Sequence, residues 1–271
     1  MDIAQSDYSN IIAYIGRLSI EQLSFFSEKL RWLQIPSHGY NGFDNKNLYK
    51  NPDIVVSCVK DIFSEPIAQY CITAYFLFNT YSFRKKGAEL NRCHIASLKP
   101  TILIMGIGNI GQALAKKCKQ MGWTVYGVKR TIPERLPDYA DGLCRLEDIS
   151  KYIGVADYVV NILPEQSSSI GLFDYSFFKM MNSDALFCNV GRKSAVVDAD
   201  LSKAVKSGVI RGAILDAHNE FDYDTPDIIL TGHSSSVSAD NDKNFDKYFA
   251  AQLNAFLTDT EIKNKIILKE V

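Results

Sequence analysis

The stretch Ile102-Leu-Ile-Met-Gly-Ile-Gly-Asn-Ile-Gly111 decides the fold of this chain. Apolar residues run directly into a Gly-x-Gly-x-x-Gly pattern, and the residues that follow carry apolar side chains at helical spacing, at Ile110, Leu114, Cys118 and Met121. The pattern predicts a buried strand over 101–105, a tight turn, and a helix over 109–121. A strand, a turn and a helix in this order make up the first part of a β-α-β unit.

Downstream of this stretch, short β-branched runs alternate with amphipathic segments. The runs predict strands over 123–128, 157–163, 185–190, 210–216 and 228–231, and the segments between them predict helices over 174–181 and 198–207. Alternation of strand and helix is typical of a parallel, doubly wound sheet. The fold class is therefore α/β, with a Rossmann-type dinucleotide-binding domain expected over residues 95–240.

The first third of the chain has a different pattern. Ser19-Ile-Glu-Gln22 has the form of a capping box, and apolar residues follow it at helical spacing up to Leu33, so a helix is predicted there. Ile54-Val-Val-Ser57 predicts a strand, and Ser64-Glu-Pro66 predicts the start of a long apolar helix. The apolar residues of 245–256 predict a last helix that returns to this part. We expect a second, smaller domain made of residues 1–94 plus 241–271.

Composition excludes several classes of protein. The 30 basic and 31 acidic residues leave a formal charge of −1, without the basic excess of a nucleic-acid-binding protein. No apolar run approaches the roughly 18 residues of a membrane span, and the first residues lack a secretory signal pattern. The six cysteines include no Cys-x-x-Cys pair, which is typical of buried free thiols in a reducing compartment. We expect a cytoplasmic protein with no nucleic-acid or membrane partner and no metal site.

Each glycine of the turn has a structural role that a larger residue could not fill. Gly106 permits the tight turn, Gly108 lets the backbone approach a pyrophosphate, and Gly111 lets helix and strand pack closely. Asn109 and Ile110 begin the helix, whose unpaired N–H groups and positive dipole end attract an anion. The stretch predicts a dinucleotide site, and a glycine-rich turn without a ligand remains the alternative.

The residues after the second strand of this domain bear on the choice of cofactor. An NAD enzyme usually places an acid there, on the 2′-hydroxyl of the adenosine ribose. This chain has Val128-Lys129-Arg130-Thr131 instead. Two cations and a hydroxyl suit a 2′-phosphate, so the sequence favours NADPH over NADH. Solvated cations at the end of a strand are the alternative.

The chain resembles the D-isomer-specific 2-hydroxyacid dehydrogenase family, and within it the glyoxylate/hydroxypyruvate reductase branch. The resemblance covers nearly the whole chain in order. Its motifs are Leu30-Arg-Trp-Leu-Gln34 with Ser37-His-Gly39, the glycine turn, Asn161-Ile-Leu-Pro164, Asn189-Val-Gly-Arg192, Gly212-Ala-Ile-Leu-Asp216 and Thr231-Gly-His233. It implies an oxidoreductase that transfers hydride between NADPH or NADH and a small 2-keto or 2-hydroxy acid, such as glyoxylate or hydroxypyruvate. It also implies a homodimer and a flavodoxin-like smaller domain, here shortened at its N-terminus.

The resemblance also implies residue roles. Arg192 matches the arginine that grips the substrate carboxylate, and His233 matches the acid that protonates the carbonyl oxygen. The loop Ser37-His38-Gly39 matches the turn whose backbone N–H groups meet the substrate. Around the cofactor, the implied contacts come from Leu163, Pro164, Val190, Gly191 and Asp216, the last beside the nicotinamide carboxamide.

One catalytic position departs from the family pattern. The family's glutamate, which pairs with the histidine, would fall at Phe221, and Glu220 lies one position earlier. Either Glu220 serves through a loop one residue shorter, or His233 lacks its carboxylate partner.

Two other functions are alternatives to the reductase. A cofactor-binding sensor or assembly subunit of the same fold, with little or no turnover, would tolerate the shortened domain and the displaced glutamate. A short-chain dehydrogenase lacks support, because no Tyr-x-x-x-Lys pair follows the glycine turn at a suitable place.

Overall fold

The computed structural model describes residues 5–37, 39–40, 42–60, 62–79, 97–225 and 227–270. The chain forms two compact units, one of Met1–Phe63 with Ser238–Val271 and the other of Ser64–Val237. The expected boundary at residues 94 and 95 lies outside the described residues. The long apolar helix that starts at Ser64 was expected in the smaller domain, but it belongs to the larger unit because it packs against the helix of the glycine turn.

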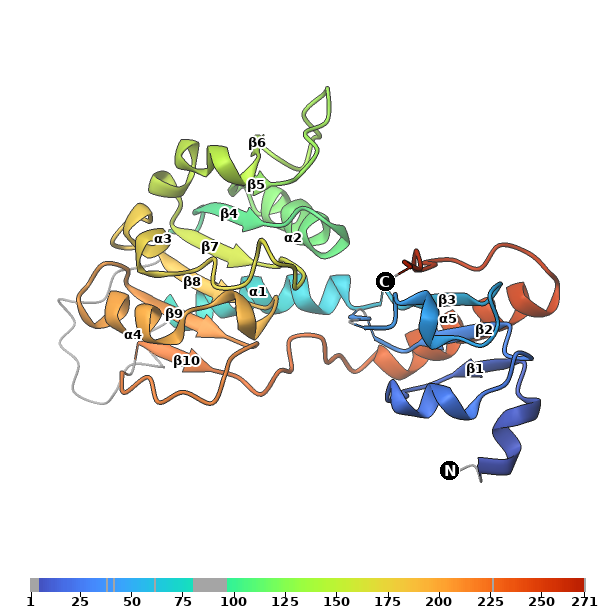
Figure 1. Ribbon diagram of the computed structural model, residues 1–271. Helices are drawn as coiled ribbons and strands as arrows, with labels where there is room; N and C mark the ends of the chain where they lie inside the picture. Colours follow the sequence, from blue (N-terminus) through green and yellow to red (C-terminus); the bar gives the residue numbers. More distant parts are fainter. Residues whose placement is uncertain are drawn as a thin grey trace. The chain divides into compact units, whose positions relative to one another are not determined.

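The larger unit contains a seven-stranded sheet in the order β10-β9-β8-β7-β4-β5-β6, with every neighbouring pair parallel (Figure 1). The order reverses at β4, which lies between β5 and β7, as in a doubly wound Rossmann sheet. The strands are β4 (Thr101–Met105), β5 (Thr124–Val128), β6 (Gly142–Cys144), β7 (Tyr158–Asn161), β8 (Leu186–Asn189), β9 (Gly212–Leu215) and β10 (Ile228–Leu230).

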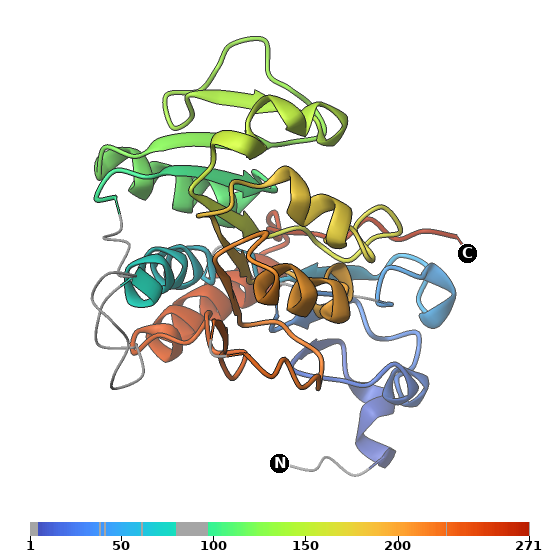
Figure 2. The same cartoon turned by 90° about the vertical axis from the view of Figure 1, so that its left-hand side faces the viewer.

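Helices cover both faces of this sheet. The two helices α1 (Ser64–Asn79) and α2 (Asn109–Gln120) pack against each other on one face, and α3 (Tyr175–Met180) and α4 (Asp198–Lys206) pack against each other on the opposite face (Figures 1 and 2). Because both faces are covered, the central strands are buried along their whole length; every residue of β7, β8 and β9 is buried. The predicted parallel α/β sheet is confirmed. Short 3-10 turns lie at Leu146–Lys151, Ile153–Val155 and Lys193–Ala195.

The smaller unit contains a three-stranded parallel sheet in the order β1-β2-β3. Its strands are β1 (Ala13–Ile15), β2 (Trp32–Ile35) and β3 (Val55–Cys58), and its helix is α5 (Asn241–Leu257), with 3-10 turns at Gln5–Asn10, Glu21–Phe25 and Lys46–Leu48. A buried hydrogen-bond chain runs through it. The Trp32 indole N–H donates to Ser57 Oγ at 2.9 Å, Ser57 Oγ donates to Gln34 Oε1 at 2.7 Å, and Gln252 of α5 donates to the same oxygen at 3.3 Å.

The helix predicted from the capping box is wrong beyond its first turn. The reciprocal bonds of the box are present, because Ser19 N–H donates to Gln22 Oε1 at 2.8 Å and Gln22 N–H to Ser19 Oγ at 3.3 Å. They start only the 3-10 turn Glu21–Phe25, after which Phe26 is extended, with φ −78° and ψ 152°. Leu33, which continues the helical spacing in the sequence, lies on β2.

Five of the six cysteines are buried and form no disulfide with one another, namely Cys58, Cys71, Cys118, Cys144 and Cys188. Cys93 lies outside the described residues. Within the described ranges, no helix has the length and apolarity needed to cross a membrane. The same ranges contain no cluster of three or more histidine, cysteine or acidic residues that could hold a metal ion.

Candidate dinucleotide and active site

The glycine turn joins β4 to α2 at the point where the strand order reverses. Gly106 has φ +109°, a conformation that residues with a β-carbon rarely adopt. A β-carbon at Gly111 would lie 2.2 Å from the Gly106 carbonyl oxygen, whereas one at Gly108 would have no protein atom within 4 Å. The turn is therefore tight at Gly106, closely packed at Gly111 and open at Gly108.

The start of α2 suits an anion. Gly108 is its N-cap and offers no side-chain hydrogen bond, Asn109 and Ile110 follow, and the first turn contains no acidic residue. The first N–H groups of a helix have no partner within the helix, and its dipole is positive at this end. The open space at Gly108 and this helix start fit the pyrophosphate of a dinucleotide.

The cationic end of β5 is fixed beside the turn. The Gly106 and Ile107 N–H groups both donate to the Val128 carbonyl, at 3.2 and 3.1 Å, so Lys129 and Arg130 follow directly from the residue that binds the turn. Lys129 is partly buried and Arg130 is exposed. Neither side chain makes an ion pair or hydrogen bond with another described residue, so both charges are available to a ligand.

On the other side of the turn, Leu163 approaches Gly106. A β-carbon at Gly106 would lie 3.3 Å from Leu163 Cδ2, and the Ile162 N–H donates to the Met105 carbonyl at 3.0 Å. The residues that lead to Pro164 therefore lie beside the glycine turn, after the carboxyl end of β7. This is the place where open α/β sheets bind dinucleotides.

Two buried asparagines, for which the sequence predicted no role, organise the ends of β7 and β8. Asn161 Nδ2 donates to Asn189 Oδ1 at 2.8 Å. Asn189 Nδ2 donates in turn to the Ala217 carbonyl at 2.6 Å and to the Arg192 carbonyl at 3.2 Å. Each asparagine ends an apolar strand and faces its partner across the ladder. That placement at two neighbouring strand ends is the sequence signal that could have identified them.

These bonds fix the backbone of Val190-Gly191-Arg192. The Val190 N–H donates to the Asn161 carbonyl at 3.1 Å, and a β-carbon at Gly191 would lie 2.8 Å from Asn161 Nδ2. The Arg192 side chain is half-buried, and its Nη1 donates to the Gly191 carbonyl at 2.9 Å. Its other donors make no bond with described residues, so they remain free to bind a carboxylate.

His233 lies in a turn three residues beyond β10. Its backbone is left-handed, with φ +54°, and its N–H donates to the Thr231 carbonyl at 2.9 Å. The side chain is exposed. The imidazole makes no hydrogen bond or ion pair with the described residues and is open to a ligand.

Asp216, immediately after β9, is buried beneath this turn. Its carboxylate accepts bonds from Thr231 Oγ1 at 2.7 Å, from the Ser234 N–H at 2.8 Å and from the Ser235 N–H at 3.0 Å. Burial alone would raise the pKa of Asp216, but the hydrogen bonds from Ser235, Thr231 and Ser234 outweigh it and hold the pKa below its usual value. Asp216 is therefore ionised.

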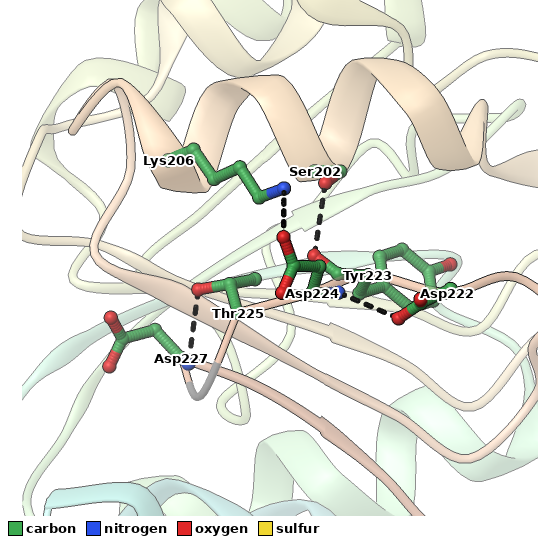
Figure 3. A network of polar contacts seen from close by, with 7 residues as sticks. All are labelled: Ser202, Lys206, Asp222, Tyr223, Asp224, Thr225 and Asp227. Atoms are coloured by element: carbon green, nitrogen blue, oxygen red, sulfur yellow. Dashed lines mark hydrogen bonds and ion pairs between the residues drawn. The ribbon is translucent and has the colours of Figure 1, made fainter.

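The loop that contains Glu220 is fastened to α4; Figure 3 shows this for Tyr223 and Asp224. Asn219 Nδ2 donates to Asp198 at 2.6 Å, and the Tyr223 hydroxyl donates to the other oxygen of that carboxylate. Ser202 Oγ donates to the Tyr223 carbonyl at 3.2 Å, and Lys206 pairs with Asp224 at 3.4 Å. Glu220 itself is exposed and makes no hydrogen bond or ion pair in the described structure, so no bond joins it to His233.

The expected substrate loop belongs to the smaller unit. Ser37 Oγ donates to the Gly39 carbonyl at 2.7 Å, and the Ser37 carbonyl accepts the Val59 N–H at 3.2 Å. These two bonds hold the ends of the loop in place. His38 lies outside the described residues.

Comparison with known proteins identifies the family. Residues 81–235 match the NAD-binding domain of the D-isomer specific 2-hydroxyacid dehydrogenases, which is more than half of the chain. The chain belongs to this family. The match contains the glycine turn, the two asparagines, Arg192, Asp216 and His233.

Two curated relatives have reductase names. The chain is 27% identical to the glyoxylate/hydroxypyruvate reductase A of Yersinia enterocolitica, over 52% of this chain and 46% of the relative. It is also 27% identical to the glyoxylate reductase of Thermococcus gammatolerans, over 88% of this chain and 77% of the relative. The chain thus spans about half the length of the first relative and most of the second.

Solved structures share the fold over almost all of this chain. The NADPH-dependent glyoxylate/hydroxypyruvate reductase from Sinorhizobium meliloti, in complex with NADP and sulfate, has a TM-score of 0.80 at 21% identity, covering 96% of this chain and 86% of its own. An NAD-complexed member of the family from Lactobacillus delbrueckii has a TM-score of 0.78 at 18% identity, covering 97% and 88%. One neighbour holds NADP and the other NAD, so the fold alone does not select the cofactor.

Proposed function

We propose that this chain is a reductase that adds a hydride from NADPH to the keto carbon of a small 2-keto acid, such as glyoxylate or hydroxypyruvate. The observation that carries the proposal is that three turns lie along the same edge of the seven-stranded sheet. The glycine turn, the Arg192 turn and the His233 turn follow β4, β8 and β10, whose carboxyl ends lie along one edge of one parallel sheet. Ligands of open α/β sheets bind at this edge.

The residues of this edge supply what reduction of a 2-keto acid needs. A bound nicotinamide supplies the hydride. The free guanidinium donors of Arg192 bind the carboxylate and polarise the keto oxygen, and the exposed imidazole of His233 gives that oxygen its proton. Leu163, Pro164, Val190, Gly191 and Asp216 remain the proposed cofactor contacts. The proposed role of Ser37, His38 and Gly39 in binding the substrate rests on the family resemblance alone.

The deciding experiment is NADPH and NADH oxidation by the purified protein with glyoxylate, hydroxypyruvate, pyruvate and longer 2-keto acids. We expect turnover that falls about 100-fold or more in Arg192→Ala and in His233→Ala. Lys179→Ala, which removes a cation of α3 away from these turns, is the control and should keep the wild-type rate. Turnover that survives in both catalytic variants would refute the assignment.

The proposed preference for NADPH rests on Lys129 and Arg130. The double variant Lys129→Ala/Arg130→Ala should weaken NADPH binding about tenfold or more and change the Kd for NADH by less than about twofold, because only NADPH carries the 2′-phosphate. The measurement is fluorescence titration of each cofactor. A wild-type protein that binds NADH more tightly than NADPH would contradict the preference.

The sensor or assembly subunit remains a second candidate because of one observation. Glu220, the proposed carboxylate partner of His233, lies in a loop fastened to α4 and makes no bond with the histidine. A protein that binds NADPH tightly and turns over none of the acids above would support this alternative. In the reductase, Glu220→Gln should change the pH profile of kcat.

Assembly and location are proposed from the family resemblance. The apolar helix α1 gives a homodimer little support, because Ile67, Cys71, Ala74 and Tyr75 are buried within the larger unit itself. Sedimentation equilibrium of the purified chain tests the dimer, and fluorescence microscopy of a tagged chain tests the proposed cytoplasmic location.

A further inference from the structure

The Asp216 carboxylate accepts three hydrogen bonds from one short segment, residues 231–235. One oxygen accepts from Thr231 Oγ1 and from the Ser234 N–H, and the other accepts from the Ser235 N–H. His233 lies between these anchor points. The carboxylate therefore binds this segment through both of its oxygens.

The bond to Thr231 extends to α1. The Tyr70 hydroxyl lies 2.7 Å from Thr231 Oγ1. An ionised carboxylate only accepts hydrogen bonds, so the Thr231 proton points to Asp216 and the threonine oxygen must accept from Tyr70. Burial raises the pKa of Tyr70, so its hydroxyl keeps the proton that this donation needs. The direction of the chain is therefore Tyr70 to Thr231 to Asp216.

The segment that these bonds hold contains an unfavourable backbone. His233 is left-handed, with φ +54°, although it carries a β-carbon. Such conformations persist where the surrounding contacts fix them. Here the fixing contacts are the three bonds to Asp216, the bond from Tyr70, and a ring nitrogen of His218, which lies 3.2 Å from the Thr231 carbonyl.

We propose that Asp216, Thr231 and Tyr70 are positioning residues, which set the backbone of the His233 turn and thereby the place of its imidazole. Through these bonds Asp216 acts on the turn, in addition to its proposed contact with the nicotinamide. The catalytic consequence rests on the proposed reductase function. The conformational part rests on the geometry alone.

The first test is amide hydrogen exchange at Ser234 and Ser235 in the full-length protein without cofactor. Thr231→Val keeps the shape but removes the hydroxyl that links Tyr70 to Asp216, and Thr231→Ser keeps that hydroxyl. We expect exchange at both amides to become about tenfold faster in Thr231→Val and Tyr70→Phe and to stay within about twofold in Thr231→Ser. Tyr75→Phe, which removes another hydroxyl of α1, is the control and should leave both amides unchanged.

The second test separates positioning from cofactor binding. Thr231→Val should lower kcat about tenfold or more with the 2-keto acid that the wild type reduces, while the Kd for NADPH stays within about twofold. Thr231→Ser should restore kcat. A raised Kd for NADPH in Thr231→Val with unchanged exchange at Ser234 and Ser235 would show that the threonine acts on cofactor binding and not on the turn, and would overturn the inference.

Failure of the proposed function is a separate result. If the wild type reduces no 2-keto acid, the reductase proposal fails, and the exchange measurement still decides whether the chain of bonds holds the turn. Unchanged exchange in Thr231→Val and Tyr70→Phe refutes the inference whether or not the protein is a reductase.

Discussion

Gly108 and Gly111 lie three residues apart in the same turn, and the space beside each predicts opposite effects of an added methyl group. In Gly111→Ala the β-carbon would lie 2.2 Å from a backbone oxygen, so turn and helix must separate, and we expect a loss of about 2 kcal/mol or more of folding free energy together with weaker cofactor binding. In Gly108→Ala the β-carbon meets no protein atom. We expect an unchanged melting temperature but weaker binding, because the methyl group occupies the space proposed for the pyrophosphate.

The measurements are thermal unfolding and cofactor titration of both variants. For each variant, the wild type and the other variant of the pair serve as references. A glycine outside the turn such as Gly208 is unsuitable as a control, because at its φ of +71° an alanine would itself be strained. Equal melting temperatures for Gly108→Ala and Gly111→Ala would contradict the packing argument. Undiminished cofactor binding by Gly108→Ala would argue against a dinucleotide at this turn.

Asp141 links α2 and β5 to the start of β6, and its carboxylate makes part of the folding stability depend on pH. Its carboxylate accepts from Lys119 of α2 and from the Val125 N–H of β5, both at 2.7 Å, just before β6 begins. Burial raises the pKa of Asp141, but the bonds from Lys119 and Val125 outweigh it and the pKa is lowered. A lowered folded-state pKa means that the stabilisation is present above the unfolded value of 3.8 and is lost as the pH falls through the folded value.

Asp141→Asn should therefore cost up to about 1 kcal/mol at neutral pH, a modest amount because solvent screens this half-exposed pair. The difference from wild type should shrink toward zero as the pH falls below the unfolded pKa. Urea unfolding at a series of pH values measures it, with Asp138→Asn, an exposed aspartate nearby, as the control. A difference that grows in acid would contradict the assigned direction of the pKa shift.

The elements that could be predicted from the sequence are those whose signal is local. The β-branched runs gave six of the strands of the larger unit, because strands buried on both faces are continuously apolar. β6 was missed because Gly142-Leu-Cys144 is too short to show a pattern. The capping-box helix was wrong because helical spacing across a 3-10 turn and a strand arose by chance, and the actual boundary depends on β2 pairing with distant strands.

The residues of the site also fall into those with local contacts, which the sequence predicts, and those paired across strands, which it does not. The spacing of the glycines predicts their contacts, since each acts on its immediate neighbours. The pairing of Asn161 with Asn189 and of Asp216 with Thr231 joins residues from different strands, so it becomes visible only when the sheet order is known. Whether Glu220 reaches His233 likewise depends on a loop held by α4, which no spacing rule reports.

For the whole molecule, the burial of the cysteines predicts that the folded protein reacts slowly with thiol reagents. Burial raises the pKa of Cys118 to about 12 and also raises the pKa of Cys71 and Cys144, so little thiolate forms near neutral pH. We expect the five described thiols to react with a thiol reagent only as fast as the native protein opens, and all six to react at once in denaturant. Mass spectrometry of timed labelling measures this. Rapid labelling of Cys71 or Cys118 in the native protein would contradict their burial.

The left-handed backbone of His233 also bears on how the chain can evolve. Folding alone favours glycine or asparagine at such a position, by about 1 kcal/mol over a residue with a larger side chain. A library randomised at position 233 and selected only for thermal survival should therefore drift away from histidine, whereas one selected for growth that depends on turnover should return to it. Opposite outcomes at a single codon would reveal that histidine is retained there at the expense of foldability.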